Sequence, residues 1–208
     1  MQQNQHLKMG VDNMNTINYK NITESQDFYQ VSGYKNIEIP WYVTQPIMDI
    51  TKPDDVKSGD YYLKKNDKVL VASGEQSFLY LMVKGLLPEG YYQGVTPCFR
   101  FEKIDSLHRK TFIKNELIYA SYDVNNELKK EFEKILGDAK TFFETKLDSN
   151  IDVVEVKQTN SIINYDLEYN GYELGSYGIR TYMNMKWVYG TGCAEPRLSF
   201  IENIRNTL

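Results

Sequence analysis

Two short segments of this sequence carry arginines among residues that could contact a nucleotide. The first, residues 96–102 (TPCFRFE), holds Arg100 and Glu102 two positions apart. Residues two apart in a strand share one face, so both side chains would point into one cleft, with Phe99 and Phe101 packing on the other side. A guanidinium can bind phosphate through two hydrogen bonds, and a carboxylate accepts them from an amine or ammonium group. The alternative is a surface ion pair, which contributes little to stability.

The next part of the chain adds cations and an aromatic ring. His108 and Arg109 lie in a polar loop, Phe112 follows it, and Glu116 comes four residues later. The second arginine segment is residues 190–197 (GTGCAEPR). A guanidinium is suited to cover the face of a π-system such as a nucleotide base. These residue types predict a site for a nucleoside triphosphate, although His108 could equally be a solvated loop residue.

In this order, the segments resemble the motifs of the class II aminoacyl-tRNA synthetases. Residues 99–116 resemble motif 2, residues 190–197 resemble motif 3, and residues 33–46 (GYKNIEIPWYVTQP) resemble motif 1, which builds a dimer interface in the family. The resemblance covers most of the chain. It implies an α+β fold with an antiparallel sheet flanked by helices, the catalytic core of class II aminoacyl-tRNA synthetases and biotin ligases. The related ammonia-dependent asparagine synthetase is also similar. Pro196, directly before Arg197, departs from the glycine-rich entry that is usual in motif 3.

The resemblance implies a reaction and roles for the nucleotide-binding residues. In the family, a carboxylate attacks the α-phosphorus of ATP and gives an acyl-adenylate and pyrophosphate. Arg100 would contact the α-phosphate and the attacking carboxylate. Phe112 and Arg197 would cover the two faces of adenine, and Glu102 would read its amino group. The loop cations, His108 or Arg109, would reach the γ-phosphate.

The resemblance also implies a metal ligand and a site for the acid. Glu173 would hold Mg²⁺ on the triphosphate, with help from Glu116. Glu75 would contact the ammonium group of a substrate amino acid, and Glu116 and Ser176 would line the same site. Glu75 could equally be a first-turn glutamate that the helix dipole favours. A structural ion pair is the preferred interpretation of Arg180, ahead of a substrate carboxylate ligand.

Length and composition limit the alternatives. The 208 residues are 41% hydrophobic and 25% charged, which is ordinary for a globular protein. We expect a flexible arm at residues 1–21 and one catalytic domain at residues 22–208, without an anticodon-binding domain. The net charge of -4 gives no overall attraction to a polyanion such as tRNA. We expect a cytoplasmic protein, because the sequence shows no membrane span and no signal-peptide core. Cys98 and Cys193 lack metal-ligand spacing and are interpreted as reduced thiols.

Hydrophobic periodicity predicts the elements that would position these residues. Helices are predicted at residues 23–32, with Thr23 as the N-cap, and at residues 76–87 and 126–147. Extended segments are predicted at residues 37–48, 61–64, 69–72, 112–122, 151–156, 162–169 and 172–180. Asn170 and Gly171 are typical of a tight hairpin turn.

The sequence therefore predicts an enzyme that uses ATP and Mg²⁺ to activate an amino acid or a similar carboxylate. The acceptor would be a tRNA, a carrier protein or a small molecule, and the enzyme would be a homodimer through residues 33–46. The alternative is a non-catalytic synthetase paralogue that senses a ligand or partner. The matching chemistry of Arg100, Glu102, Phe112 and Glu173 favours catalysis, because a pure scaffold need not keep it.

Overall fold

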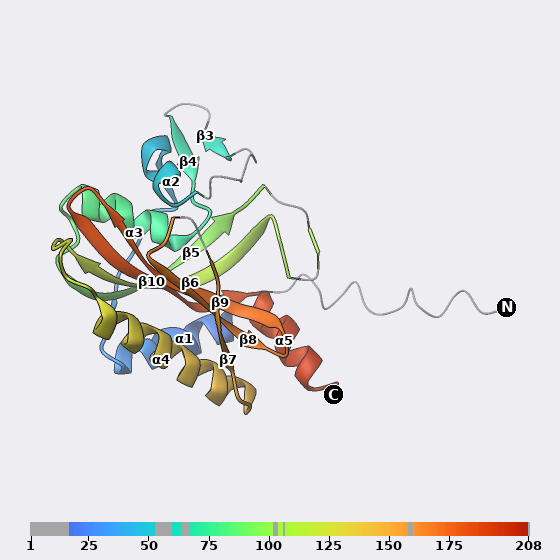
Figure 1. Cartoon of the computed structure of the whole chain (residues 1–208). Helices are drawn as coiled ribbons and strands as arrows, with labels where there is room; N and C mark the ends of the chain where they lie inside the picture. The colour runs from blue at the N-terminus through green and yellow to red at the C-terminus, as the bar shows by residue number, and fades with distance from the viewer. Residues whose placement is uncertain are drawn as a thin grey trace.

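A seven-stranded sheet forms the centre of the molecule (Figure 1). The computed structural model describes residues 17–52, 60–63, 67–101, 104–105, 107–157 and 160–207. The strands, in spatial order, are β1 (Lys35–Asn36), β5 (Gly90–Phe99), β6 (Thr111–Ser121), β10 (Met185–Glu195), β9 (Tyr172–Tyr182), β8 (Ile163–Tyr169) and β7 (Asp152–Glu155). All neighbouring strands are antiparallel except β1 and β5, which are parallel. The α+β fold with an antiparallel sheet and flanking helices is confirmed.

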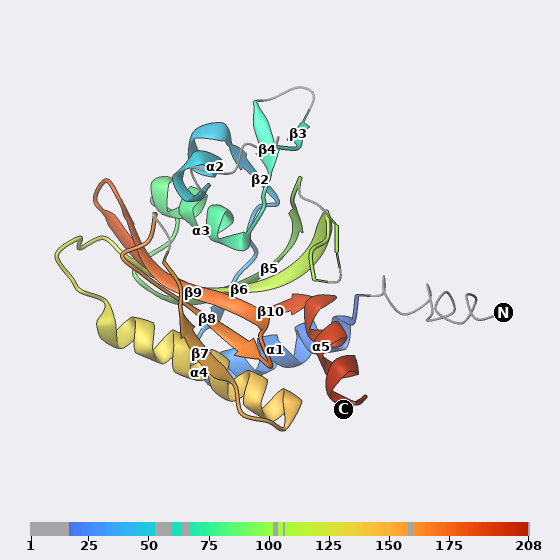
Figure 2. The ribbon, with the colours of Figure 1, turned by 45° about the vertical axis from the view of Figure 1, so that its right-hand side comes forward.

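A second, smaller sheet lies on one side of the main sheet, at the top of Figure 1. It contains β2 (Tyr42–Thr44), β4 (Lys68–Leu70) and β3 (Tyr62–Leu63), all antiparallel. Two helices, α2 (Gln45–Thr51) and α3 (Gly74–Val83), lie on the same side (Figure 2). Their apolar side chains form one core with this face of the main sheet, around Phe78 and Trp187. We call this face the upper face.

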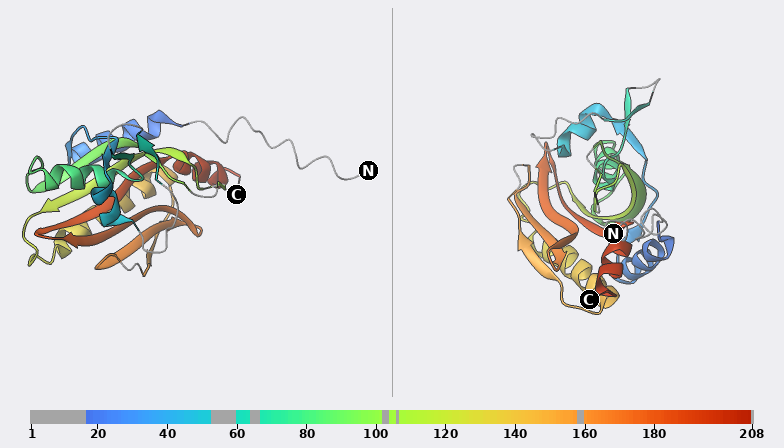
Figure 3. Two further views of the ribbon diagram at one scale, coloured as in Figure 1. Left: turned by 90° about the horizontal axis from the view of Figure 1, so that it is seen from above. Right: turned by 90° about the vertical axis from the view of Figure 1, so that its right-hand side faces the viewer.

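The other three helices lie on the lower side of the main sheet, as Figure 2 and the right-hand view of Figure 3 show. They are α1 (Tyr19–Val31), α4 (Lys129–Leu147) and α5 (Arg197–Arg205). A second core fills the space between them and the sheet. The two cores pack against opposite faces of the sheet, so the strands that carry the polar side chains of the upper face are held from both sides.

The helix α4 shows why local periodicity predicted much of this fold. Phe132, Ile135, Ala139 and Phe143 recur at spacings of three and four, and all are buried against the sheet. The turn between β8 and β9 is also as predicted. Asn170 and Gly171 have φ values of 51° and 77°, the left-handed pair that a two-residue hairpin needs.

Two predicted elements are wrong in their bounds. The first helix begins at Tyr19, because Asn18 is its N-cap and accepts a hydrogen bond from the Lys20 backbone N–H at 3.2 Å. Thr23 is therefore inside the helix, and residues 19–21, predicted to be part of a flexible arm, are helical. The extended segment predicted at residues 37–48 ends at Thr44, and α2 follows with Pro46 in its first turn. Residues 1–16 lie outside the described residues.

The remaining predicted elements are confirmed within a few residues. The hairpin of β3 and β4, the helix α3, the return strand β6 and the strands β7 to β9 all occur where the periodicity placed them. In the part of the chain that the structure describes, no helix has both the length and the apolar character of a membrane span.

Candidate active site

The middle of the upper face is lined by alternate residues of β6, an interior strand of the sheet. Phe112, Lys114 and Glu116 share this face, since residues two apart in a strand point the same way. Phe112 is half-buried, while Lys114 and Glu116 are buried. The helix α3 begins directly above, because a Cβ at Gly74 would lie 2.8 Å from the Cβ of Glu116. These side chains therefore form a polar surface that α3 covers at one end, and we refer to this surface with α3 above it as the cleft.

Arg100 lies beside Phe112. Its Nε donates to the Ala72 carbonyl at 3.0 Å, and its guanidinium carbon is 5.0 Å from the centroid of the Phe112 ring. The strand β5 ends at Phe99, so Arg100 follows the strand rather than belonging to it. Its backbone N–H still donates to the Lys110 carbonyl at 2.9 Å, which continues the hairpin by one step.

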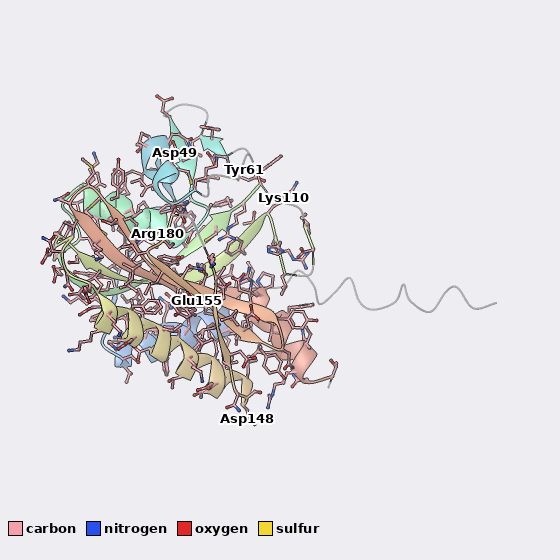
Figure 4. All side chains as sticks on the ribbon, in the orientation of Figure 1. Asp49, Tyr61, Lys110, Asp148, Glu155 and Arg180 are labelled. Atoms are coloured by element: carbon pink, nitrogen blue, oxygen red, sulfur yellow. The ribbon has the colours of Figure 1, made fainter. Side chains whose placement is uncertain are left out.

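Phe101 does not pack as predicted. It is 57% exposed, because it lies beyond the end of β5, and the sheet has no lower face there to receive it. Its ring lies 6.2 Å from the ring of Tyr61 and 5.7 Å from the ammonium of Lys110. Figure 4 shows Tyr61 and Lys110 at the same end of the molecule. Glu102, predicted to read adenine, lies outside the described residues.

Glu116 is held by two donors. Its Oε1 accepts from Lys114 Nζ at 3.0 Å, and its Oε2 accepts from Ser73 Oγ at 2.7 Å. Ser73 is fixed in turn because its backbone N–H donates to the side chain of Gln76 in the first turn of α3, at 3.1 Å. The carboxylate therefore has one orientation, toward the start of α3.

Glu75 and Arg180 form a buried ion pair at the end of the cleft next to α3. Arg180 Nη1 lies 2.5 Å from one oxygen of Glu75, and Trp187 Nε1 donates to the other at 2.7 Å. Burial has the largest single effect and opposes the charged form of Arg180, but the Glu75 carboxylate, with smaller contributions from Tyr189 and Glu116, outweighs it and raises the pKa of the guanidinium. Figure 4 shows Arg180 between the main sheet and α3. This contact agrees with the interpretation of Arg180 as a structural ion pair, and its carboxylate partner is Glu75.

Glu173 and Arg197 form the opposite wall. Arg197 is the first residue of α5, and its Nη1 lies 2.5 Å from Glu173 Oε1. Burial has the largest single effect and raises the pKa of Glu173, but the charge and hydrogen bond of Arg197, with the smaller effects of Lys114 and Arg100, together outweigh it and lower the pKa. Lys114 and Arg100 act in the same direction, so both cations lie within electrostatic reach of Glu173. The structure thus brings Arg100, Phe112, Glu173 and Arg197 to one face.

Asp166 belongs to this wall, and the motifs did not predict it. It lies on β8 opposite Ser176 of β9. Its Oδ1 is buried and has no hydrogen-bond partner among the described residues. Burial raises the pKa of Asp166 to about 6, although the neighbouring Ser176 hydroxyl opposes this effect. Ser176 itself donates to Asn164 at 3.3 Å. The sequence signal was the alternation of polar side chains in β8, which places Asn164 and Asp166 on one face.

His108 and Arg109 lie in the loop between β5 and β6. His108 Nδ1 is 2.8 Å from Asp105 Oδ2, and both side chains are exposed. Asp105 also accepts from the backbone N–H groups of Leu107 and His108, at 2.8 Å each. These bonds lower the pKa of Asp105 to about 2, with the His108 side chain as the largest cause. The loop therefore has a local structure of its own beside the cleft.

Solved structures of synthetases share this arrangement of strands and helices. The cytoplasmic serine-tRNA ligase from Naegleria fowleri, in complex with AMP, matches with a TM-score of 0.73 and 19% identity, over 90% of this chain and 53% of that one. Seryl-tRNA synthetase from Pyrococcus horikoshii, complexed with ATP, matches with a TM-score of 0.70 and 18% identity, over 87% and 48%. Pyrrolysyl-tRNA synthetase from Desulfitobacterium hafniense matches with a TM-score of 0.69 and 15% identity, over 89% of this chain and 69% of that one. The chain has the fold of a class II aminoacyl-tRNA synthetase catalytic core.

The class II synthetase fold is retained here with little sequence identity. No model of a known protein family matches the sequence, and no curated protein matches it. The chain spans about half the length of the two seryl-tRNA synthetases. In this fold, the segment that resembles motif 2 is the hairpin of β5 and β6, and the segment that resembles motif 3 is the junction of β10 and α5.

Proposed function

We propose that this protein uses ATP to activate a carboxylic acid, an amino acid or a similar compound, as its acyl-adenylate. The observation that carries the proposal is the convergence of Arg100, Phe112, Glu173 and Arg197 on one face of a class II synthetase sheet. Two of the structures that share the fold contain AMP or ATP, which is consistent with a nucleotide at this face.

The reaction requires little from the protein beyond positioning the substrates and stabilising the negative charge that develops. A carboxylate is already ionised at neutral pH, so no general base is needed for its attack on the α-phosphorus. Phe112 would stack on adenine, with Arg197 on the opposite face once it is released from Glu173. Arg100, already held by the Ala72 carbonyl, would stabilise the negative charge that develops at the α-phosphate.

The class II fold also implies a magnesium ion, and two carboxylates suit it. Mg²⁺ is usually held by one or two carboxylates together with substrate phosphates and water. Asp166 has a buried oxygen without a hydrogen-bond partner among the described residues, and Glu173 lies within electrostatic reach of it. We propose that Glu173 and Asp166 hold the ion. It would neutralise part of the charge of the triphosphate.

The acceptor and the assembly are further parts of the proposal. A tRNA, a carrier protein or a small molecule would accept the acyl group, in the cytoplasm, where ATP is available. We propose a homodimer through residues 33–46. This segment exposes Trp41 and Tyr42, which line an open groove of 560 Å³ together with Ile39 and Leu63. Exposed aromatic side chains beside an apolar groove are typical of protein interfaces.

The test is the exchange of labelled pyrophosphate into ATP, across a panel of amino acids and their analogues. We expect exchange that depends on one acid and disappears in Arg100→Ala. ATP binding in a calorimetric titration without exchange, for any acid of the panel, would favour the ligand-sensing paralogue. Absence of ATP binding would refute the proposed site.

A further inference from the structure

Lys114 is a buried cation in the middle of the cleft floor, and neither the motifs nor the roles above assign it a task. It is 9% exposed and lies on β6 between Phe112 and Glu116. Its neighbours across the sheet are Thr96 on β5 and Ala194 on β10. Lys114 therefore lies between the strand that leads to Arg100 and the strand that leads to Arg197.

The charge of Lys114 is costly to bury, and Glu116 only partly explains why it is there. Lys114 Nζ donates to Glu116 Oε1 at 3.0 Å, while the other oxygen of Glu116 accepts from Ser73 Oγ. An apolar side chain would satisfy packing at lower cost, as Ile118 does four residues further along the same face. The electrostatic effect of Lys114 extends across β10 to Glu173, and to the thiol of Cys98. Its field therefore reaches the wall on which the triphosphate is proposed to lie.

The spacing along β6 indicates what would lie above Lys114. Successive residues on one face of a strand are about 7 Å apart. In the proposed site, adenine stacks on Phe112 and the acid lies near Glu116. The α-phosphate joins the two in the acyl-adenylate, so it must lie between them, above Lys114.

We propose that Lys114 is a further catalytic residue, whose ammonium contacts the α-phosphate while the acyl-adenylate forms. This inference rests on the proposed function. In the step, a carboxylate oxygen forms a bond to the α-phosphorus, the bond from that phosphorus to the bridging oxygen breaks, and pyrophosphate leaves with the electron pair. Lys114 keeps its proton and balances the negative charge that grows on the two non-bridging oxygens.

The competing explanation is that Lys114 only neutralises Glu116. Four variants separate the two: Lys114→Met, Lys114→Arg, Glu116→Gln, and the double variant Lys114→Met/Glu116→Gln. The double variant has neither charge, so it removes the unpaired carboxylate that Lys114→Met leaves behind. Thermal unfolding would verify that each variant is folded.

We expect Lys114→Met to lower kcat for pyrophosphate exchange about 100-fold, the typical effect of losing one donor to a developing oxyanion. Lys114→Arg should recover most of this loss. The double variant should remain about 100-fold below Glu116→Gln alone. If the double variant equals Glu116→Gln, Lys114 only neutralises Glu116 and the inference is wrong.

A binding measurement tests the contact without turnover. Lys114→Met should weaken AMP binding about tenfold, the typical effect of losing a charged hydrogen bond, and leave adenosine binding unchanged. If the unmodified protein binds both ligands and Lys114→Met binds AMP with the same affinity, this inference is wrong while the proposed function still stands. If the unmodified protein binds neither ligand, the proposed function and this inference fail together.

Discussion

At the scale of residues, the cleft is defined by paired charges. Glu75 pairs with Arg180, Glu116 with Lys114, and Glu173 with Arg197. Arg197 must leave Glu173 when adenine binds, but the other two pairs join different parts of the fold or two positions of one strand, so they fix their side chains before a ligand binds. This preorganisation is what a reaction driven by position and charge requires.

The ring of Phe112 should dominate the binding of adenine. Phe112→Ala is expected to raise the KM for ATP roughly 10- to 100-fold, since stacking of an aromatic ring on a base contributes about 1–3 kcal/mol. Phe101→Ala is the matched control, because Phe101 is an exposed aromatic at the end of the same hairpin. Steady-state exchange kinetics would measure both. Equal effects of the two substitutions would contradict stacking on Phe112.

Asp166 should make stability depend on pH. Its pKa rises from 3.8 to about 6 in the folded protein, so the fold favours the protonated form. The ionised carboxylate therefore lowers stability above pH 6, and this penalty disappears as the pH falls below about 4. Asp166→Asn cannot ionise, so its Tm should exceed that of the unmodified protein at pH 7.5, with the difference vanishing near pH 4.

Asp105→Asn is the control for this pH test. The pKa of the exposed Asp105 is lowered to about 2, so its ionised form is favoured by folding. Asp105→Asn should therefore not raise the Tm at pH 7.5. In calorimetric titrations, Asp166→Asn should also lose much of the Mg²⁺-dependent part of ATP binding. An Asp166→Asn protein with the same Tm difference at every pH would argue against a titrating carboxylate.

The sequence predicted which motif residues lie on one face better than it predicted their contacts. Arg100, Phe112 and Arg197 could be grouped because they belong to short local motifs, and their chemical roles stay predictions. The pairing of Glu75 with Arg180 could not, because 105 positions separate the two residues and only the sheet brings them together. Asp166 was missed because a single acidic residue in an alternating strand is ordinary until its burial is known.

At the scale of elements, the cleft depends on the close approach of α3 to β6. Gly74 allows it, since an added Cβ would lie 2.8 Å from Glu116 Cβ and 3.3 Å from both Ile39 and Thr96. Gly74→Ala should therefore destabilise the fold by about 1–3 kcal/mol through overpacking, and reduce exchange because Glu75 follows directly. Gly137 in α4 is the matched control, because nothing lies within 4 Å of its added Cβ.

The two glycine substitutions should have opposite signs. Gly137→Ala is expected to stabilise the protein by about 1 kcal/mol, because alanine has the higher helix propensity. Urea unfolding would measure both free energies. A neutral Gly74→Ala would mean that α3 can move away from the sheet, and the cleft would then be less rigid than inferred.

Elements with strong local signals were predictable, and those set by distant contacts were not. The stripe of α4 and the Asn170-Gly171 turn are encoded within one segment. The helix α2 was missed because Pro46 is compatible with both a strand end and a first helical turn. Its apolar residues Ile47 and Met48 are buried in the core with α3 and the small sheet, which decides between the two.

At the scale of the whole molecule, the exposed aromatics of residues 33–46 predict self-association. Trp41 is 58% exposed. We expect a dimer by light scattering, and Trp41→Glu should shift it to monomer because the introduced charge would be buried at the interface. Val31→Glu, at a position that is 90% exposed on the lower side, should leave the dimer intact. A monomer of the unmodified protein at micromolar concentration would refute this assembly.

The position of β10 in the sheet has a consequence for biosynthesis. This strand lies between β6 and β9, yet it follows every other strand of the sheet in the chain. During synthesis, the hairpin of β5 and β6 and the hairpin of β8 and β9 emerge from the ribosome before β10. Until β10 pairs with them, β6 and β9 are exposed edge strands, and such strands can pair with other chains. We therefore expect the nascent protein to need protection until β10 has emerged and joined the two halves.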